Sequence, residues 1–377
     1  MDAQSDRGLV RFFKTMPDPR AGNALHSLTD IFVLAICAVI CGCDGWVQVA
    51  QYANTKRAFF TSFLELANGI PSHDTFGRVF AQLNPVEFEK CFCAWVGSLA
   101  ETSGGKLLAI DGKSLRRSFE RSWDKSGMAH LVSAFASNNQ MVFGQLATEE
   151  GSNEITAIPK LLELLELENT TVTIDAIGCQ KEIAKKIRDG KGNYFLAAKD
   201  NQHKLYTQVK SVLDEAIKLK FAGMTHDYFE ETSGGHGRIE TRQTWITTDI
   251  AWLGELIKEW PGLSTLTVMK SSRKVNGQTS ITHRYYIGSN AASTAQEAAH
   301  AIRSHWAIEN NLHWILDMSF DEDQRRVRND DGAENFSRLC RIALNLLKTD
   351  KTKKVGIKTK RLIAGWDDKF LLGLLLG

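Results

Sequence analysis

Two stretches of sequence decide the fold: KLLAIDG at residues 106–112 and TVTIDAIG at residues 171–178. Each is a run of apolar and β-branched residues that ends in an aspartate, a pattern typical of a buried strand followed by a turn. Functional groups of an open α/β sheet collect at the carboxyl ends of its strands. Aspartate is also a common turn cap, but two aspartates at matching strand ends favour a shared site. We therefore expect Asp111 and Asp175 to face one another at one edge of a sheet.

The segments around these two stretches predict a mixed α/β sheet. Strand patterns over residues 130–137 and 141–147 follow the first stretch, and a helical pattern over 154–167 comes next. A helix over 180–189 and a strand over 193–199 follow the second stretch. Three strands, a helix, a strand, a helix and a strand are the order expected of a ribonuclease H-like sheet.

The regions outside this core differ from it in pattern. Residues 1–105 show helical spacing without a strand pattern, which predicts an all-α N-terminal domain. The ribonuclease H-like domain is expected over 106–350, with a β-rich insertion at about 203–290. The insertion ends before a long helical stretch that carries Glu309. The last residues, 351–377, are expected to form a basic C-terminal tail.

The charge of the chain is unevenly distributed. Its 377 residues include 46 Lys and Arg against 44 Asp and Glu, and the net charge of +2 by itself indicates no strong attraction to nucleic acid or membrane. Residues 1–105 hold 8 basic and 10 acidic side chains, whereas residues 325–377 hold 13 basic and 6 acidic ones. The excess positive charge is therefore concentrated after the long helical stretch.

The composition predicts a reduced, cytoplasmic protein without membrane contact. Seven cysteines lie mostly in apolar runs and form no paired C-x-x-C motif, so neither a disulfide framework nor structural zinc is expected. The N-terminus lacks the basic and apolar segments of a signal peptide. The most apolar early run, residues 31–43, is shorter than the roughly 20 residues that cross a bilayer.

A third carboxylate lies in the helical stretch HWAIENNLHWILD at residues 305–317. At 3.6 residues per turn, His305, Glu309 and His313 share one helical face. A glutamate in a mostly apolar helix needs a partner, and a metal shared with the two aspartates would be one. Oxygen-only ligands select Mg²⁺ or Mn²⁺, and two such ions about 4 Å apart can stabilise both oxygens of a phosphodiester displacement.

Several longer motifs follow one another along nearly the whole chain. They are PDPRAGNALHSLTDIFVLAICAVICGCDGW and IPSHDTFGRVF, then AIDGKSLRRS, TIDAIGCQKEIAKKI and NYFLAAKDNQ, and finally HWAIENNLHWILDMSFDED and ENFSRLCRIALNLLK. In these motifs the chain resembles bacterial insertion-sequence transposases of the DDE type, and most closely the H-repeat-associated group.

The resemblance implies an activity, a cofactor and a partner. It implies an enzyme that binds the ends of its element and cuts and rejoins DNA, with two Mg²⁺ or Mn²⁺ ions held by Asp111, Asp175 and Glu309. The implied partner is double-stranded DNA, at the element ends and at the target, on the bacterial nucleoid. Bringing two ends together implies at least a homodimer.

The chain departs from the Tyr-x2-Arg-x3-Glu-x6-Lys pattern that the larger superfamily carries around the glutamate. The Tyr, Arg and Lys positions hold Ile302, His305 and Leu316. The H-repeat group resembles this chain in having His-Trp at this point. The roles in DNA contact that belong to these positions therefore stay open.

Basic and amide side chains near the three carboxylates are candidates for DNA contact, because such groups bind phosphate oxygens. One group follows the first aspartate, one follows the last core strand, and one follows the long helix. The alternative interpretation is a solvated loop for the group after the first aspartate and a solvated face for the group after the long helix. His305 could instead be a helix-surface histidine that a local carboxylate satisfies. The candidates are His305, Lys113, Lys199, Asn201, Gln202, Arg325, Arg326 and Arg328, with Arg116 and Arg117 beside Lys113 and with Arg338 and Arg341 continuing the last group.

Other assignments stay open. Asp317, Glu322 and Asp323 could supply the third metal ligand in place of Glu309. The two histidines and the glutamate of the long helix could bind zinc, although their spacing differs from H-E-x-x-H. The same triad would also serve a metal-dependent nuclease without strand transfer, and a decayed copy of an element could bind DNA without cutting it.

Overall fold

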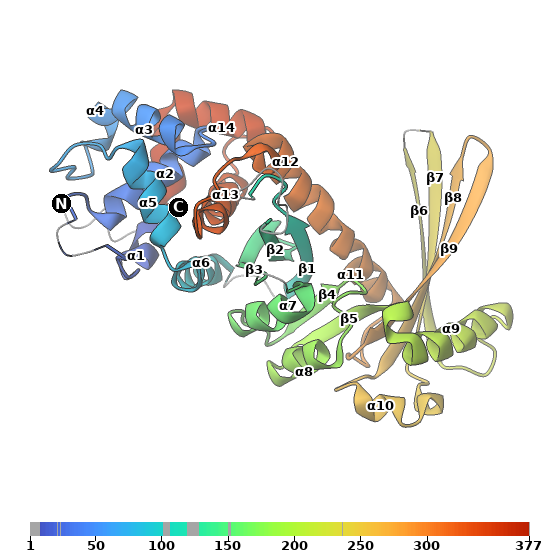
Figure 1. Ribbon diagram of the computed structural model, residues 1–377. Helices are drawn as coiled ribbons and strands as arrows, with labels where there is room; N and C mark the ends of the chain where they lie inside the picture. The colour runs from blue at the N-terminus through green and yellow to red at the C-terminus, as the bar shows by residue number, and fades with distance from the viewer. Residues whose placement is uncertain are drawn as a thin grey trace.

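The chain folds around one nine-stranded mixed sheet, with a body of helices at one end and two long hairpins projecting at the other (Figure 1). The computed structural model describes residues 8–20, 22, 24–100, 106–118, 128–149, 152–235 and 237–376. The mixed α/β architecture expected from the sequence is confirmed.

Helices make up the N-terminal part of the chain: α1 (Val10–Phe13), α2 (Leu28–Ile40), α3 (Trp46–Thr55), α4 (Arg57–Phe60), α5 (His73–Gln82) and α6 (Pro85–Ala100). Ser27 caps α2 by accepting a hydrogen bond from the backbone N–H of Asp30 at 3.4 Å, and residues 31–40 are all buried. Ser72 caps α5 through the N–H of Thr75 at 3.2 Å. No helix in the described part of the chain has both the length and the apolar composition of a membrane span.

The core of the sheet alternates with helices in the predicted order: β1 (Lys106–Ser114), β2 (His130–Ala136), β3 (Met141–Ala147), α7 (Glu154–Glu163), β4 (Thr170–Ile174), α8 (Lys181–Asp189) and β5 (Asn193–Ala198). β2 pairs antiparallel with both β1 and β3. β4 lies between β1 and β5 and runs parallel to both. The carboxyl ends of the three parallel strands therefore meet at one edge.

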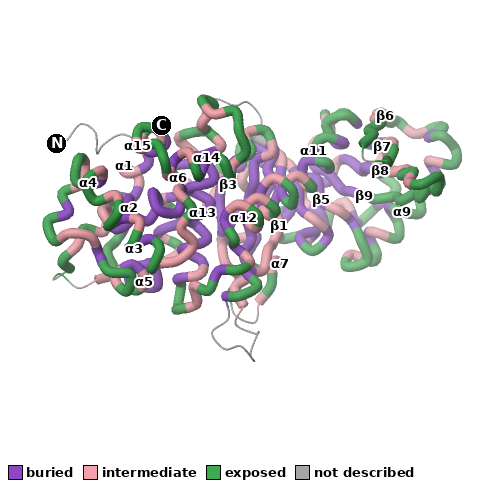
Figure 2. Tube along the Cα trace, turned by 90° about the horizontal axis from the view of Figure 1, so that it is seen from above, coloured by how far each residue is buried: buried purple, intermediate pink, exposed green. Residues whose placement is uncertain are grey.

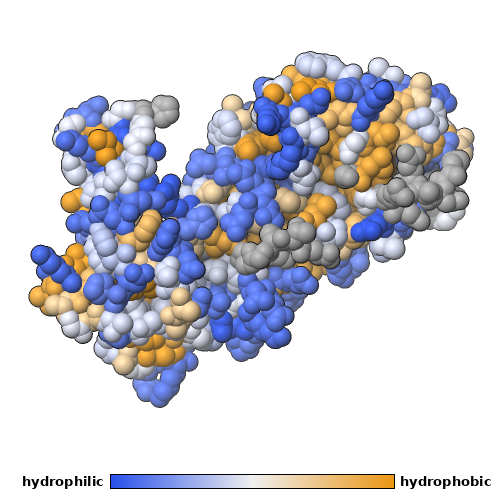
Figure 3. All heavy atoms as spheres, turned by 180° about the vertical axis from the view of Figure 1, so that it is seen from behind, coloured by the Kyte–Doolittle hydropathy of each residue, from blue (hydrophilic) through white to orange (hydrophobic). Residues whose placement is uncertain are grey.

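The strands of the next segment, residues 200–288, extend the same sheet. Its elements are a 3-10 turn (Asp200–Gln202), α9 (His203–Lys218), β6 (His226–Gly235), β7 (Arg238–Thr247), a second 3-10 turn (Ala251–Leu253), α10 (Leu256–Glu259), β8 (Thr265–Val275) and β9 (Gln278–Gly288). β9 pairs antiparallel with β5, and the full strand order is β3-β2-β1-β4-β5-β9-β8-β7-β6. The hairpins β6–β7 and β8–β9 stand away from the main body, and Figure 3 shows a notch between them and that body.

A long helix with a π turn in its middle crosses the sheet. α11 (Ala295–Ile308) continues through the π turn (Glu309–His313) into α12 (Trp314–Phe320). Thr294 and Glu297 form a capping box at the start of α11. α11 packs against β1, β4 and β5 and also contacts β6 and β7.

The C-terminal helices join the helical body. After a 3-10 turn (Glu322–Gln324) come α13 (Gly332–Thr349), α14 (Ile357–Trp366) and α15 (Asp368–Leu376). The segment expected to be a basic tail thus contains two helices. Lys360 Nζ donates to the carbonyl oxygen of Leu347 at 2.8 Å, and Arg361 Nη2 donates to that of Val39 at 2.8 Å. Both cationic side chains are buried and hold α14 against its neighbours.

α13 joins the helical body to the sheet. β3 is an edge strand, and Asn345 on α13 replaces its missing neighbour by accepting from the N–H of Val142 at 2.9 Å and donating to its carbonyl oxygen at 2.8 Å. Glu89 on α6 accepts from the N–H of Gln145 at 2.6 Å. These side chains cover an edge that would otherwise be open to another strand. Buried residues continue from the helices into the sheet, and one hydrophobic cluster spans both (Figure 2).

Candidate active site

A cleft of about 560 Å³ is lined by the three expected carboxylates together. Asp111 lies on β1, Asp175 directly follows β4, and Glu309 begins the π turn. Ile110 and Ile174 are register partners in the parallel pair of β1 and β4, so the two aspartates occupy equivalent positions one residue further on. β5, β9 and α11 supply the other walls of the cleft.

Burial raises the pKa of Asp111 to about 7. Neighbouring negative charges on Glu154, Asp175 and Glu309 act in the same direction. The N–H of Gly112 donates to Asp111 Oδ1 at 3.0 Å and opposes the shift. A carboxyl group among like charges is stabilised by a proton or by a cation, so this position attracts positive charge.

Asp175 lines the cleft and also caps the turn after β4. Its Oδ1 accepts hydrogen bonds from the N–H groups of Ile177 at 3.0 Å and Gly178 at 3.4 Å. The two interpretations of this residue, turn cap and site residue, are therefore compatible. The cap fixes the direction in which the carboxylate points.

The π turn sets the position of Glu309. A π turn holds one residue more than an α turn, and it begins at this glutamate. Around this turn Ile308, Leu312 and Leu316 are buried, whereas Ile315 is only partly buried. Glu309 itself is exposed on the cleft side.

Two partly buried histidines of the same helix lie beside the carboxylates. His313 Nδ1 is 3.8 Å from Asp111 Oδ2. Burial lowers the pKa of His313 to about 3, and it also lowers the pKa of His305. Within the described residues, His305 Nδ1 and His313 Nε2 are buried without a hydrogen-bond partner. Both rings are therefore neutral near pH 7, and each has one buried nitrogen whose hydrogen-bonding capacity is unmet.

The donor set of the cleft fits a hard divalent cation. Carboxylate oxygens are the ligands that Mg²⁺ and Mn²⁺ prefer. The raised pKa of Asp111 and the two histidine nitrogens without partners mark a place where polar groups are left unsatisfied. Among the residues that the structure describes, no three His, Cys, Asp or Glu side chains are close enough to form a complete metal site, which also applies to the zinc alternative. Mutual repulsion keeps carboxylates apart when no cation lies between them.

Lys113, a candidate for DNA contact, is held inside the protein. Its Nζ forms an ion pair with Asp317 and another with Glu322 Oε2 at 3.0 Å. Arg341 Nη1 lies 2.8 Å from Glu322 Oε1. Burial alone would raise the pKa of Glu322, but the positive charges of Arg341 and Lys113 hold it far below its usual value. Lys113 therefore balances internal carboxylates and is not part of a DNA surface, and Glu322 has cationic partners in place of a metal.

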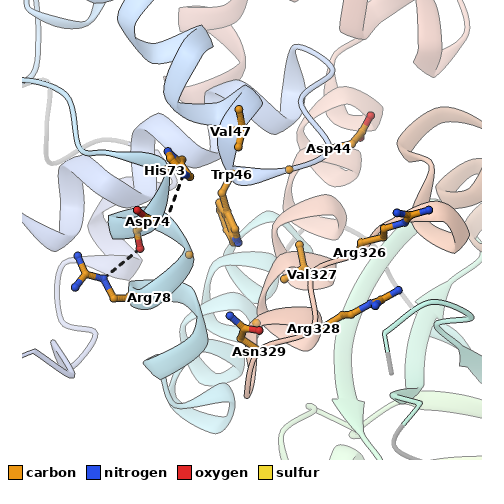
Figure 4. Close-up of a pocket in the computed structure, with 13 residues that line it drawn as sticks. Asp44, Trp46, Val47, His73, Asp74, Arg78, Arg326, Val327, Arg328 and Asn329 are labelled. Carbon is orange, nitrogen blue, oxygen red and sulfur yellow. Dashed lines mark hydrogen bonds and ion pairs between the residues drawn. The ribbon is translucent and has the colours of Figure 1, made fainter. Parts of the chain in front are cut away.

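The three arginines after α12 have different surroundings. Arg325 is 8% exposed, its Nη2 donates to the carbonyl oxygen of Phe320 at 2.6 Å, and its guanidinium lies 4.3 Å from the ring centre of Phe336. The expectation that Arg325 contacts DNA is corrected, because its side chain closes the core. Arg326 is exposed, and it lines a separate groove beside the N-terminal helices together with Arg328 (Figure 4).

The basic run that continues along α13 is also internal. Arg338 is fully buried and pairs with Glu89 and, at 2.8 Å, with Glu334. Arg341 is fully buried with Glu322 as its partner. The positive charge counted after Glu309 therefore overstates the charge that DNA could reach.

The residues after β5 divide between the cleft and its support. Lys199 is exposed and lines the cleft. Asn201 Nδ2 donates to the carbonyl oxygen of Ala176 at 2.5 Å, and Gln202 Nε2 donates to that of Cys179 at 3.0 Å. The two amides thus hold the turn after β4, which carries the second aspartate.

A fourth carboxylate that sequence reasoning missed lies next to Asp111. Ser114 Oγ is 2.7 Å from His130 Nδ1, and His130 Nε2 is 2.7 Å from Glu154 Oε1. Glu154 can come this close because Gly112 has no side chain: a Cβ there would lie 2.0 Å from Glu154 Oε1. Nothing in the sequence near Glu154 signals this approach, because it depends on how α7 packs against β2 and β3.

β9 forms a cationic and aromatic wall that the sequence analysis did not single out. His283, Arg284 and Tyr285 line the cleft. The guanidinium of Arg284 lies 4.5 Å from the ring centre of Trp306 on α11. This placement depends on the pairing of β9 with β5, which only the complete sheet establishes.

Two family descriptions match most of the chain. The family "DDE_Tnp_1-associated" matches residues 10–96, and the family "Transposase DDE domain" matches residues 102–346. The second match includes all three carboxylates of the cleft.

Full-length relatives agree with these matches. The chain is 40% identical over 361 residues to "Putative transposase YncI" of Escherichia coli O157:H7, which covers 95% of this chain and 91% of the relative. It is 38% identical over 375 residues to "H repeat-associated putative transposase YhhI" of Escherichia coli (strain K12), with 98% of each chain covered. Among solved structures it is similar to a piggyBac transposase synaptic complex with hairpin DNA, with a TM-score of 0.43, 11% identity, and 97% of this chain and 79% of the other covered.

Proposed function

Because the chain belongs to the family of transposases with a DDE domain, we propose that it binds the ends of an insertion sequence and catalyses metal-dependent cleavage and strand transfer of DNA. One observation carries this proposal: Asp111, Asp175 and Glu309, from three separate parts of the chain, line one cleft. Carboxylates arranged around an open cleft suit phosphodiester displacement with two metal ions. The core strand order, with three parallel strands ending at the cleft, supports a ribonuclease H-like catalytic domain.

The three carboxylates would hold the metal ions in this proposal. Asp111 and Asp175 would be shared between two Mg²⁺ or Mn²⁺ ions, and Glu309 would hold the second ion. Bound metal would supply an activated water or 3′-hydroxyl as nucleophile and would stabilise the charge on the leaving oxygen. Asp111 must give up its proton to act as a ligand, and a nearby cation lowers its pKa.

Other side chains of the cleft would handle the phosphate. His305 lines the cleft, burial lowers the pKa of its ring, and the neutral ring would hydrogen-bond a water or a phosphate oxygen. Lys199 and Arg284 line the cleft and would neutralise the scissile strand. Glu154, held by His130, would fix the charge around Asp111.

The proposal includes the assembly and the location of the protein. Two element ends are joined in one reaction, so we propose at least a homodimer on double-stranded DNA. The reaction would take place in the bacterial cytoplasm, on the nucleoid. The domain division into residues 1–105, 106–350 and 351–377 is part of the same proposal, although α14 and α15 pack into the helical body.

A cleavage assay tests the proposal. The substrate is a linear duplex that carries the inverted repeats expected on either side of the gene, incubated with purified protein and Mg²⁺. We expect nicking at the repeat ends and joining to a target plasmid, both abolished by EDTA. Asp111→Ala and Asp175→Ala should each lower the rate by about a thousandfold or more, because losing several kcal/mol of metal-based stabilisation corresponds to that factor.

The assay also separates the alternatives. Nicking without joining would indicate a nuclease, and DNA binding without metal-dependent nicking would indicate a non-catalytic remnant. Full activity of Asp111→Ala would contradict the proposal.

A further inference from the structure

A groove lies between the N-terminal helices and the segment that leads into α13. We call residues 325–331 the strap, and the space between the strap and the first turns of α3 and α5 the helix–strap groove. Its volume is about 670 Å³. Residues far apart in the sequence form it, with Trp46 and Arg78 on the helices and Arg326 and Arg328 on the strap.

The floor of the groove is rigid and partly apolar. The indole of Trp46 stacks on Phe80 with ring centres 4.8 Å apart and meets Phe336 edge-on at 4.8 Å. A Cβ on Gly77 would lie only 3.3 Å from the indole, so α5 packs directly on this ring. Val47, which is 59% exposed, extends the apolar surface. The groove is therefore already formed in the folded chain.

Cationic groups lie on both sides of Trp46. In Figure 4, Arg78 lies to one side of the indole and Arg326 and Arg328 to the other. Arg78 and Arg326 are exposed. Arg78 Nε donates only at 3.4 Å to the backbone oxygen of Asp74, and Arg326 forms no ion pair within the described residues.

Asp44, one of the two carboxylates that line the groove, already has cationic partners. Asp44 Oδ1 lies 3.7 Å from Arg361 and 4.0 Å from Arg325, both of which are buried. Asp74 lies 3.4 Å from His73 Nε2. The exposed guanidinium groups of Arg78 and Arg326 therefore outnumber Asp74, the groove carboxylate that has only a histidine beside it. The first residues of α3 and α13 also line the groove, and the partial positive charge of a helix N-terminus adds to that of the arginines.

The strap is tied to the segment that follows Asp111. Arg328 Nε donates to the carbonyl oxygen of Arg117 at 3.1 Å, and Arg116 Nε lies 3.1 Å from Asp323 Oδ2 just before the strap. Both contacts reach the loop after β1. A ligand bound in the helix–strap groove would therefore rest on a segment connected to the cleft.

We propose that the helix–strap groove is a second DNA-binding site, in which Arg78 and Arg326 contact phosphates of the duplex outside the cleft. The inference rests on the proposed function for its choice of polyanion. Cations distributed on both sides of an open groove suit an extended phosphate backbone better than a single small anion. The N-terminal helices would thus hold DNA together with the strap.

Binding of a labelled duplex to the full-length protein tests this site. The probe is a fluorescein-labelled DNA duplex of arbitrary sequence and about 30 base pairs, long enough for the several phosphate contacts that set a salt slope. Fluorescence anisotropy is measured in EDTA over a series of NaCl concentrations, so that no cleavage interferes. The variant is Arg78→Gln/Arg326→Gln, and the matched control is Arg57→Gln, which removes an exposed arginine of α4 that does not line the groove.

We expect the double variant to weaken binding at least about tenfold near 0.1 M salt and to reduce the slope of log K against log salt by about 2, one for each lost phosphate contact. Arg57→Gln should leave both quantities unchanged. Val47→Glu, which places a negative charge at an exposed position of the groove, should weaken binding as well, and it guards against a folding defect in the double variant. An unchanged slope in the double variant, or an equal loss in Arg57→Gln, would overturn the proposal.

Failure of this site and failure of the proposed function give different results. If Asp111→Ala abolishes cleavage while the arginine variant binds normally, the second site is wrong and the proposed function stands. If the arginine variant loses binding while the wild-type protein never cleaves, the site stands and the proposed function fails.

Discussion

Asp111 combines burial, neighbouring charge and a position at the end of a strand. Its pKa of about 7 in the folded chain lies well above the ordinary value of 3.8, first because of desolvation and then because of nearby carboxylates. A group whose pKa is raised on folding stabilises the fold most below its unfolded pKa, and that contribution is lost as the pH rises through its folded pKa. Without metal, the folded chain should therefore lose stability through Asp111 between about pH 4 and pH 7.

The Asp111→Asn variant makes this loss measurable. In EDTA, the variant should gain stability relative to the wild type as the pH rises from 5 to 7.5, by up to a few kcal/mol. Urea unfolding at the two pH values measures the difference. An equal difference at both values would contradict the raised pKa.

Glu154 contributes to that pKa through its charge. Glu154→Gln should lower the pKa that Asp111 has in the folded chain. In the Glu154→Gln background, the stability difference that Asp111→Asn produces should therefore reach its full size at a lower pH. Glu163→Gln is the control, because Glu163 is an exposed residue of the same helix, paired at 2.5 Å with Lys186. A shift of the same size in the control would show that Glu154 has no special effect.

The sequence predicts the positions of Asp111 and Asp175 because a buried apolar strand ending in a carboxylate is a local pattern. It does not predict Glu154, whose approach depends on the missing side chain of Gly112 and on the packing of α7. Lys113 and Arg325 look like exposed cations in the sequence. Their burial follows from carboxylates and carbonyl groups that are distant or on another element.

Among the helices and strands, the π turn is the feature that the hydrophobic periodicity of the sequence does not predict. A regular helix places Glu309 and His313 one turn apart on one face, but the π turn inserts one residue between the flanking helices. Such single-turn bulges occur frequently at functional sites. We infer that this one sets Glu309 relative to β1 and β4.

Deleting Asn310 should convert the π turn into an α turn. The melting temperature should stay close to that of the wild type, because α11 and α12 keep their own hydrogen bonds. DNA cleavage should fall about a hundredfold, the effect expected when a catalytic group moves by about 1 Å. Asn310→Ala keeps the turn length and should keep the activity, and a fully active deletion variant would remove any role for the π turn.

In the whole molecule, α13 joins the helical body to the sheet. It lies against α2, α5 and α6 and against β3. In the sequence, the arginines of α13 look like a DNA-binding face of an amphipathic helix. In the structure, Arg338 and Arg341 form buried ion pairs. The helical regions and the core sheet follow from local patterns. The continuity of the core follows from partners on α6, α13 and β3 that are far apart in sequence.

Arg338→Leu should destabilise the entire molecule. The change leaves Glu89 buried without its cation, and breaking a buried pair in this way costs about 3–5 kcal/mol. Urea unfolding followed by circular dichroism measures the loss, with Arg57→Leu as an exposed control that should change stability by less than about 0.5 kcal/mol. Equal losses of unfolding free energy in the two variants would show that the pair does not hold the helical body and the sheet together.

Iron-mediated cleavage of the protein's own backbone tests whether Asp111, Asp175 and Glu309 share a metal site. Fe²⁺ can occupy oxygen-ligand sites for Mg²⁺, and with ascorbate and peroxide it produces hydroxyl radicals that cut the backbone close to the metal. We expect fragments that end near Asp111, Asp175 and Glu309 together, suppressed by excess Mg²⁺ and lost at all three places in Asp111→Asn. Cleavage near only one of the three residues, or cleavage that neither Mg²⁺ nor the variant changes, would contradict a shared metal site.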